Sequence, residues 1–153
     1  MATLVVGVLG ERGRKDVPEE IVGNDKWSKL IFYPDWNSLE LKWLPTTRDA
    51  TEEDARSSME MFASEAVNRR PHTLIVDTTE FFHRFGEGFE EWREVSIIPK
   101  YNAAGVKKFA FVMSPDYPGQ TVESGLEPAS EGKMAFPTGW FRTREHAYEW
   151  LAS

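Results

Sequence analysis

The stretch that decides the fold spans residues 72–92 and reads "HTLIVDTTEFFHRFGEGFEEW". Its first part, residues 73–77, is an apolar run ending in an acid, which is typical of a central strand covered on both faces. A helix is expected from about Gly88. Helices that return to successive strands imply right-handed crossovers, so this stretch predicts an α/β fold with a largely parallel sheet.

Upstream, two apolar segments at residues 27–33 and 39–44 flank a turn that contains Pro, Asp and Asn. This pattern predicts an antiparallel β-hairpin at one edge of the sheet. In the second segment the apolar residues alternate with Glu40 and Lys42. We therefore expect a half-buried strand whose two charged side chains face water.

A helix is predicted between Thr51 and Pro71. The segment from Thr51 to Asp54 resembles a capping box, and its acids oppose the positive end of the helix dipole. The predicted buried face consists of four apolar residues spaced by three or four positions: Ala55, Met59, Phe62 and Ala66.

The helix expected from Gly88 carries an apolar stripe of Phe89, Trp92, Val95 and Ile98. Pro99 lies inside this pattern, so we expect a kink or a helix in two pieces, with Gly105 as the C-cap. A further strand is predicted at residues 107–113.

The remainder of the chain predicts a long loop at residues 114–133, of the length found in lids. A short strand at 134–142 and a helix at 144–152, which Thr143 would cap, complete the order of elements. The expected sheet is mixed and mostly parallel, with an antiparallel edge hairpin, and is packed by helices.

Length and composition fit one globular domain of 153 residues. We expect the domain at residues 27–153, preceded over residues 1–26 by an N-terminal arm or an extra strand at 2–9. The chain has no Cys, which excludes disulfides, thiolate metal sites and a Cys nucleophile, and favours the cytoplasm.

Charge argues against several classes of partner. The formal net charge of -7, from 25 acidic and 18 basic residues, would repel nucleic acid and anionic membranes. The apolar stretch near residue 5 is too short to span a bilayer, so we expect no membrane insertion. No phosphate-binding loop or nucleophile elbow is present, and we expect no cofactor and no enzymatic activity.

The end of the central strand supplies the candidate chemistry. Asp77, Glu80 and His83 are residue types that serve as general acids, bases or metal ligands. Against this stands a structural interpretation in which Asp77 caps the turn through backbone amides and His83 lies on the surface. We favour the structural interpretation and predict no catalytic residue and no metal site.

Aromatic residues crowd the same corner and form either core or the wall of a small-molecule pocket. Ligands of open α/β sheets favour the carboxyl ends of strands. The predicted ligand or partner surface is therefore Asp77, Glu80, Phe81, Phe82, His83, Phe85, Phe89, Trp92, Trp140 and Arg142. In the hairpin, Trp36 and Trp43 are either core or an exposed patch, and the second case predicts a homodimer.

Several segments resemble the small bacterial STAS-like proteins, which are described together with sporulation anti-sigma-factor antagonists (SpoIIAA-like proteins) and CRAL-TRIO lipid carriers. The segments are "LELKWLPTT", "TEEDARSSMEMFA", "LIVDTTEF", "EEW", "IIPKYNAAGVKKFAFVMS" and "WFRTREHAYEWL". The resemblance implies a single-domain STAS-like fold. In the antagonists a Ser or Thr after the central strand is phosphorylated, which implies a phosphoswitch at Thr78 or Thr79, although Glu80 stands where that motif has Gly.

Three functions follow as expectations. The first is a non-enzymatic binding or regulatory module that interacts with a protein partner. The alternative is a carrier or sensor of a small apolar molecule between sheet and helices, as the lipid-carrier relatives imply. The third is a hydrolase-type enzyme that uses Asp77, Glu80 or His83.

Overall fold

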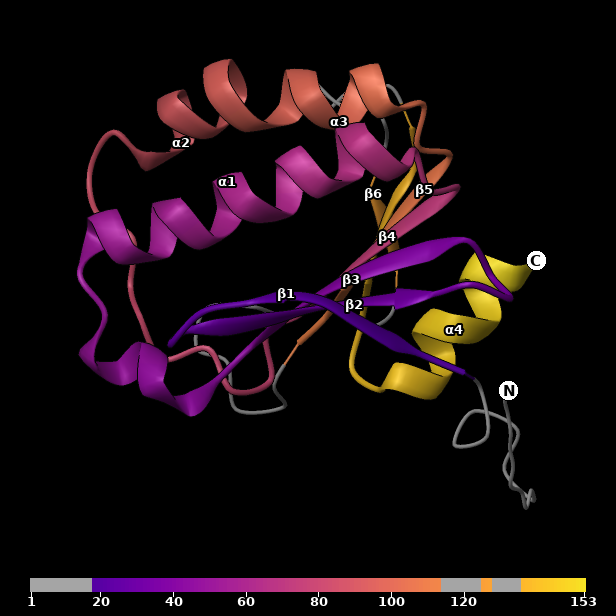
Figure 1. Ribbon diagram of the computed structural model, residues 1–153, viewed down its shortest axis with the longest axis horizontal. Helices are drawn as coiled ribbons and strands as arrows, with labels where there is room; N and C mark the ends of the chain where they lie inside the picture. The colour runs from indigo at the N-terminus through magenta and orange to yellow at the C-terminus, as the bar shows by residue number, and fades with distance from the viewer. Residues whose placement is uncertain (1–17, 114–124, 128–135) are drawn as a thin grey trace.

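The computed structural model describes residues 18–113, 125–127 and 136–153. The strand expected at 2–9 and most of the loop expected at 114–133 lie outside these residues. The described strands form one sheet in the order β1-β2-β3-β4-β5-β7-β6 (Figure 1). Their bounds are β1 (Glu20–Asn24), β2 (Ser28–Tyr33), β3 (Ser38–Trp43), β4 (Thr73–Asp77), β5 (Lys108–Val112), β6 (Gly125–Glu127) and β7 (Thr138–Phe141).

The sheet has a parallel centre and antiparallel edges. β3, β4, β5 and β7 are parallel, whereas β1 and β2 at one edge and β6 at the other pair antiparallel with their neighbours. The predicted α/β fold with a parallel centre and the β2–β3 hairpin is confirmed, but the hairpin is not at the edge of the sheet, because β1 pairs outside β2.

Two edge strands differ from the sequence prediction. β1 forms where an arm was expected, and β6 forms within the expected loop. β1 was missed because Gly23 interrupts its run of apolar residues. The pairing with β2 shifts register between Ile21 and Gly23, and a Cβ at Gly23 would come within 3.1 Å of Leu30. β6 has only three residues, too few to show a period.

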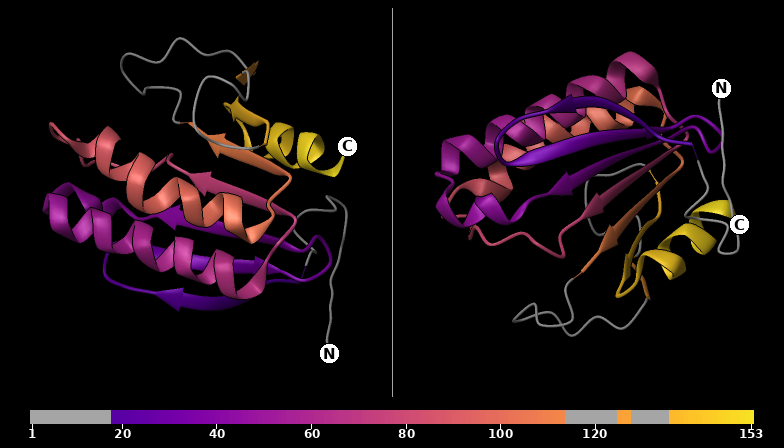
Figure 2. Two further views of the ribbon diagram at one scale, coloured as in Figure 1. Left: turned by 90° about the horizontal axis from the view of Figure 1, so that it is seen from above. Right: turned by 60° about the horizontal axis from the view of Figure 1, so that its bottom comes forward.

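Helices cover both faces of the sheet. α1 (Glu52–Arg69) lies beside the segment formed by α2 (Phe89–Trp92), η4 (Arg93–Ile97) and α3 (Ile98–Ala104) on one face. Figure 2 shows this pair of helical segments above the strands, and α4 (Arg144–Ala152) packs on β5 and β7 from the opposite face. A short 3-10 turn, η3 (Pro45–Asp49), connects β3 to α1.

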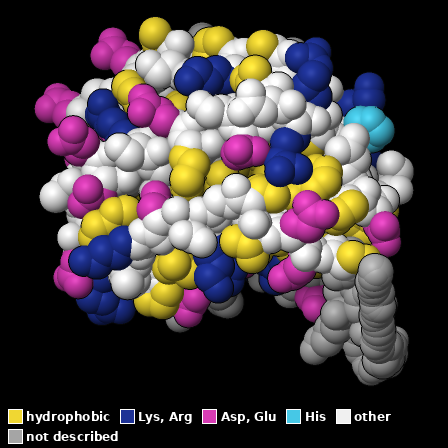
Figure 3. Space-filling view, in the orientation of Figure 1, with side chains coloured by type: hydrophobic (Ala, Val, Ile, Leu, Met, Phe, Trp, Pro, Cys, Tyr) yellow, Lys and Arg dark blue, Asp and Glu magenta, His cyan; other side chains and the backbone are white. Residues whose placement is uncertain are grey.

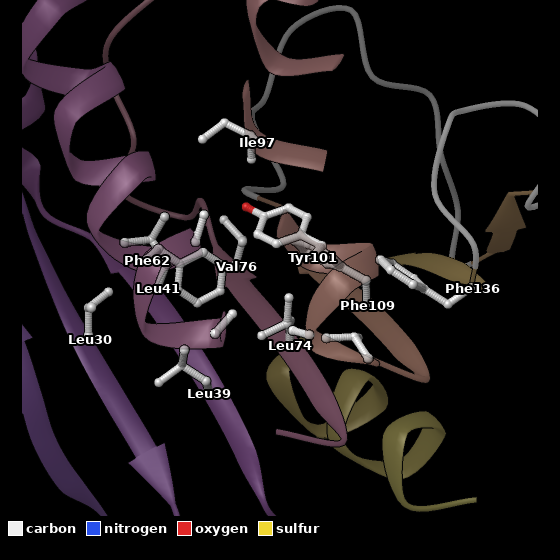
Figure 4. Close-up of a cluster of buried hydrophobic side chains, with 14 of the residues drawn as sticks. Leu30, Leu39, Leu41, Phe62, Leu74, Val76, Ile97, Tyr101, Phe109 and Phe136 are labelled. Carbon is white, nitrogen blue, oxygen red and sulfur yellow. The ribbon is translucent and has the colours of Figure 1, made fainter. Parts of the chain in front are cut away.

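The larger core lies between the sheet and α1 and α3. Alternate residues of the central strands point into it, including Leu41, Val76 and Phe109, which meet Phe62 from α1 and Tyr101 from α3 (Figure 4). A smaller core forms under α4. Each central strand is thus covered on both faces, as its continuous apolar sequence predicts.

α1 begins and ends as predicted. The Thr51 side chain accepts from the Asp54 backbone N–H, and the Asp54 side chain accepts from the Thr51 N–H, which completes the capping box. Ala55, Phe62 and Ala66 are fully buried. The helix stops at Arg70, which adopts a left-handed conformation before Pro71.

The second helical segment is interrupted, as Pro99 predicted, and Phe89 and Ile98 of its predicted apolar stripe are buried, but Val95 is not. η4 is a π-helical turn just before Pro99, and Gly105 caps α3 with a φ of 79°. The wider turn rotates the face that follows it, because each residue advances by a smaller angle than in an α-helix. Val95 is therefore 76% exposed, while Ile97 and Ile98 are buried.

Candidate functional site

The aromatic insert after β4, residues 78–88, is fixed to the start of α1. Thr47 Oγ1, buried in η3, accepts from the Phe82 backbone N–H at 2.9 Å. Glu52 Oε1 accepts from the Gly86 N–H at 3.1 Å and lies 3.2 Å from His83 Nε2. Burial raises the pKa of Glu52, but the bonds from Gly86, His83 and Arg56 together outweigh it and lower the pKa overall. Two side chains of η3 and α1 therefore hold the insert in place.

The insert forms one wall of a partly open cavity of about 680 Å³ between the sheet and the helices, at the carboxyl ends of the parallel strands. The described residues that line it come from the sheet, from the insert, from α1 and from the α2–α3 segment. The lining residues are Leu41, Trp43, Met59, Val76, Thr78, Phe81, Phe82, His83, Arg84, Phe85, Gly86, Phe89, Glu90, Arg93, Tyr101, Phe109, Phe111, Met113 and Trp140. The volume is within the range of small-molecule sites.

Aromatic rings form much of this wall and hold each other in place. Phe85 and Phe89 stack with their centroids 3.7 Å apart, and Phe81 stacks on Phe85 at 5.4 Å. On the other side, Phe111 of β5 stacks on Trp140 of β7 at 4.3 Å. The cavity therefore lies between two preformed groups of rings, one from the insert and one from the sheet.

Three polar groups at the cavity have no hydrogen-bond acceptor among the described residues. Tyr101 is 3% exposed, and no described residue accepts its hydroxyl proton. Arg93 Nε and Trp140 Nε1 are buried atoms without a hydrogen bond. In Figure 4 the Tyr101 ring extends from α3 with its hydroxyl on the side away from Phe109. Burial raises the pKa of Tyr101, and the nearby Arg93 charge lowers it by less.

The opposite face of the sheet holds a set of charged and phenolic groups, which we call the charge cluster: Tyr33, Glu40, Asp77, Arg144 and Tyr148. Arg144 of α4 donates from Nη1 to Glu40 Oε2 and to Asp77 Oδ2, both at 2.6 Å, and from Nη2 to Glu40 Oε1 at 2.9 Å. Tyr33 donates to Glu40 Oε1 at 2.6 Å, and Arg144 Nη2 also contacts the Tyr148 hydroxyl.

The charge cluster overturns the prediction that Glu40 faces water. Glu40 is 0% exposed, because β3 lies inside the sheet and α4 brings Arg144 over this face. Lys42, the other charge predicted to face water, is half-buried and lies 3.5 Å from Asp77 Oδ2. A period-2 pattern shows which face a residue is on, but not whether that face is covered.

The pKa values in the charge cluster follow from burial and from its ion pairs. Burial raises the pKa of Asp77, but two bonds from Thr79 and the charges of Lys42 and Arg144 outweigh it, so the pKa is lowered overall. Burial and the Glu40 carboxylate raise the pKa of Tyr33 and bring that of Tyr148 to about 12. Asp77 is therefore charged and the two phenols are neutral at neutral pH.

The structure brings together one part of the predicted surface. The predicted residues that line the cavity are Phe81, Phe82, His83, Phe85, Phe89 and Trp140, whereas Asp77, Glu80, Trp92 and Arg142 are not among its lining. Trp92 lies under the Arg56 guanidinium at 4.9 Å, and Arg142 is exposed.

Asp77 and His83 lie on opposite sides of the sheet, since Asp77 faces α4 while His83 lines the cavity. Asp77 Oδ1 accepts from the backbone N–H and hydroxyl of Thr79, which is the turn-capping role expected for it. The His83 side chain is 12% exposed and pairs with Glu52, so its expected surface position is wrong. Among the described residues, no group of His, Asp or Glu is placed to hold a metal.

Both threonines of the predicted phosphoswitch donate hydrogen bonds. Thr78 Oγ1 donates to the Val112 carbonyl at 2.7 Å, and Thr79 Oγ1 donates to Asp77 at 2.6 Å. Phosphorylation would replace the donated proton and place a phosphate beside a carboxylate at Thr79. The phosphoswitch stays a prediction, and these contacts oppose it.

The two hairpin tryptophans are packed rather than presented to solvent. Trp43 is 3% exposed and lies 4.6 Å from Phe81. Trp36 is half-buried between Tyr33 and Tyr148, with centroids at 5.2 and 4.9 Å. The homodimer stays a prediction, without support from these residues. On the face seen in Figure 3, acidic and basic side chains are interspersed.

The sequence missed the residues that give each region its polar character. Arg93 and Tyr101 lie on the helical segment whose face the π-turn rotates, so their direction could not be read from an α-helical period. Arg144 reaches Glu40 across 104 residues of chain. The only indication in the sequence was the presence of Arg93 and Tyr101 in a helical segment that also carries apolar residues, and this indication is weak.

Comparisons with known proteins add no relative. No family model, no curated protein and no solved structure matches this chain. No helix among the described residues combines the length and the apolar character needed to cross a bilayer. Membership of the STAS-like group therefore stays a prediction from the quoted segments.

Proposed function

We propose that this protein binds a small, largely apolar molecule in the cavity between the sheet and the α1–α3 layer. The observation that carries the proposal is the cavity of about 680 Å³ at the carboxyl ends of the parallel strands. The cavity is partly open to solvent, and its volume is in the range of small-molecule sites. It also occupies the position where open α/β sheets bind ligands.

The surroundings of the cavity support binding rather than catalysis. The aromatic walls offer flat apolar surfaces already held by stacking, so little conformational entropy is lost on binding. The acid and base candidates do not converge there: Asp77 bonds to Arg144 on the other face, and His83 pairs with Glu52. A regulatory role through a protein partner is compatible with ligand sensing, but no contact of the described residues favours it.

A neutral fluorescent probe, N-phenyl-1-naphthylamine, tests this function. We expect saturable binding with one site per chain, measured by fluorescence increase on titration with purified protein. The Val76→Phe variant places a larger side chain into the cavity from β4 and should weaken binding at least about tenfold. Val95→Phe adds the same atoms at an exposed position of η4 and should bind as the wild type does.

Folding of the variants is checked by urea unfolding before titration. If Val76→Phe does not fold, Met59→Phe enters the same cavity from α1, where the side chain is only half-buried. A probe signal that never saturates, or that saturates alike in the wild type and in the cavity variant, contradicts the proposal.

A further inference from the structure

The hydrogen-bond donors at the cavity that lack an acceptor indicate the chemistry of its ligand. Two buried donors, Arg93 Nε–H and Trp140 Nε1–H, have no hydrogen-bond acceptor among the described residues, and the Tyr101 side chain lines the same cavity. A buried donor without an acceptor costs free energy, and native proteins seldom leave one so. Arginine and tryptophan side chains can only donate, so the missing partner is an acceptor.

The charges that line the cavity favour an anion. Arg84 and Arg93 are positive and His83 is held against Glu52, while Glu90 is the single carboxylate among the described lining residues. Glu90 lies 3.6 Å from Arg93 Nε, too far for a hydrogen bond, and its side chain is 74% exposed to screening water. Arg84 is exposed as well, so the charge that bears on a bound ligand is that of Arg93, whose Nε is buried.

Arg93 and Tyr101 are carried by the same helical segment, one from η4 and one from α3. Both residues line the cavity, and the positive charge of Arg93 lowers the pKa of Tyr101 against the larger rise caused by burial. Arginine and a phenol together form a receptor for a carboxylate, because hydrogen bonds to an anion are the strong ones. The stacked rings around them fit a planar apolar body.

From this geometry we infer that the ligand is a planar aromatic carboxylate, with its anionic group bound by Arg93 and Tyr101 and its ring between the aromatic walls. The inference rests on the proposed function, because it assigns the chemistry of the same cavity. Trp140 Nε1, on the sheet side, donates to a second acceptor on the ring system of the ligand.

A matched pair of probes tests the inference: 2-naphthoate, which is anionic, and 2-naphthamide, which has the same shape and no charge. We expect 2-naphthoate to bind at least about tenfold more tightly by calorimetric titration at neutral pH, since a hydrogen bond to a charged group is worth about that factor. The cation 2-naphthylmethylammonium should bind the least tightly of the three.

Variants locate the preference. Arg93→Gln and Tyr101→Phe should each reduce the ratio of the two affinities about tenfold, with the 2-naphthamide affinity changed by less than about twofold. Arg142→Gln removes an exposed positive charge that does not line the cavity and should leave the ratio unchanged.

The outcomes separate the inference from the function on which it rests. Equal binding of both probes, abolished by Val76→Phe, overturns the carboxylate and leaves the cavity function intact. Binding of neither probe, together with no saturable binding of N-phenyl-1-naphthylamine, overturns both. A preference that survives in Arg93→Gln and Tyr101→Phe also overturns the assignment of these two residues.

Discussion

The two faces of the sheet differ in whether their buried polar groups have hydrogen-bond partners. On the α4 face, the charge cluster buries two carboxylates, and each of them has a charged partner: Glu40 bonds to Arg144, and Asp77 bonds to Arg144 and Lys42. On the other face, two buried N–H donors at the cavity, Arg93 Nε and Trp140 Nε1, have no acceptor among the described residues.

This difference separates a structural site from a binding site better than residue type does. The charge cluster contains an Arg, two acids and two tyrosines, which would serve well in an active site, yet their hydrogen bonds are directed at one another. A satisfied network of this kind contributes to a unique structure and offers little to a ligand. The cavity, which is poorer in charge, is the region with unused bonding capacity.

The largest expected effect is on the charge-cluster side. Arg144→Met leaves Glu40 without its cationic partner in a fully buried position, and we expect a loss of about 3 kcal/mol in the free energy of unfolding. Urea unfolding at neutral pH measures the loss. Arg142→Met, two residues earlier and exposed, is the matched control and should change stability by less than about 0.5 kcal/mol. Equal effects of the two substitutions would show that the network does not hold α4 to the sheet.

A pair of tyrosines tests the contrast directly. Tyr33→Phe removes a bond to the buried Glu40 carboxylate at 2.6 Å and should cost about 2 kcal/mol in unfolding free energy. Tyr101→Phe removes a hydroxyl with no described acceptor, so it should not lower the free energy of unfolding. A large cost at Tyr101 in the ligand-free protein would mean that its hydroxyl is already bonded, and the contrast between the faces would fail.

Alkaline pH should weaken the charge cluster through its phenols. Burial and Glu40 raise the pKa of Tyr148 to about 12, whereas an unfolded tyrosine has a pKa of about 10. Between these values the unfolded state loses the proton and the folded state keeps it, so stability falls as pH rises.

From pH 9 to pH 11 the wild type should lose about 1.4 kcal/mol more than Tyr148→Phe, because one pKa unit corresponds to about that energy. Urea unfolding of both proteins at the two pH values measures this. Parallel losses in the two proteins would place the pKa of Tyr148 near its ordinary value.

The order of the helices and of most strands could be predicted from the sequence. The different hydrogen bonding of polar groups on the two faces of the sheet could not. The capping box at Thr51, the break near Pro99 and the C-cap at Gly105 are local, so a short window of sequence determines them. The insert Phe81 to Phe89 was recognised as a candidate pocket because aromatic residues in a turn at a strand end are unusual. These residues do line the cavity.

The polar content of both regions depends on contacts between distant segments. The burial of Glu40 depends on the Arg144 side chain, which reaches it from the start of α4, and nothing near Glu40 in the sequence indicates this contact. The exposure of Val95 depends on the π-turn, which alters the period that the sequence analysis assumed. Glu40 and Arg93 were therefore missed for one reason, that local patterns do not show which surface will be covered.

The smallest expected effect comes from a substitution at Glu90, beside the cavity. Glu90 pairs with Arg93 across 3.6 Å from a largely exposed position, and such surface pairs contribute little to stability. Glu90→Gln should therefore change the unfolding free energy by less than about 0.5 kcal/mol.

Glu90→Gln also removes the one carboxylate of the described lining that competes for Arg93, so 2-naphthoate should bind about two- to threefold more tightly while 2-naphthamide binds as before. Glu94→Gln, an exposed acid of η4 outside the cavity lining, serves as the control for the change in net charge. If both substitutions strengthen 2-naphthoate binding equally, the effect comes from the overall charge of the chain and not from the Arg93 site.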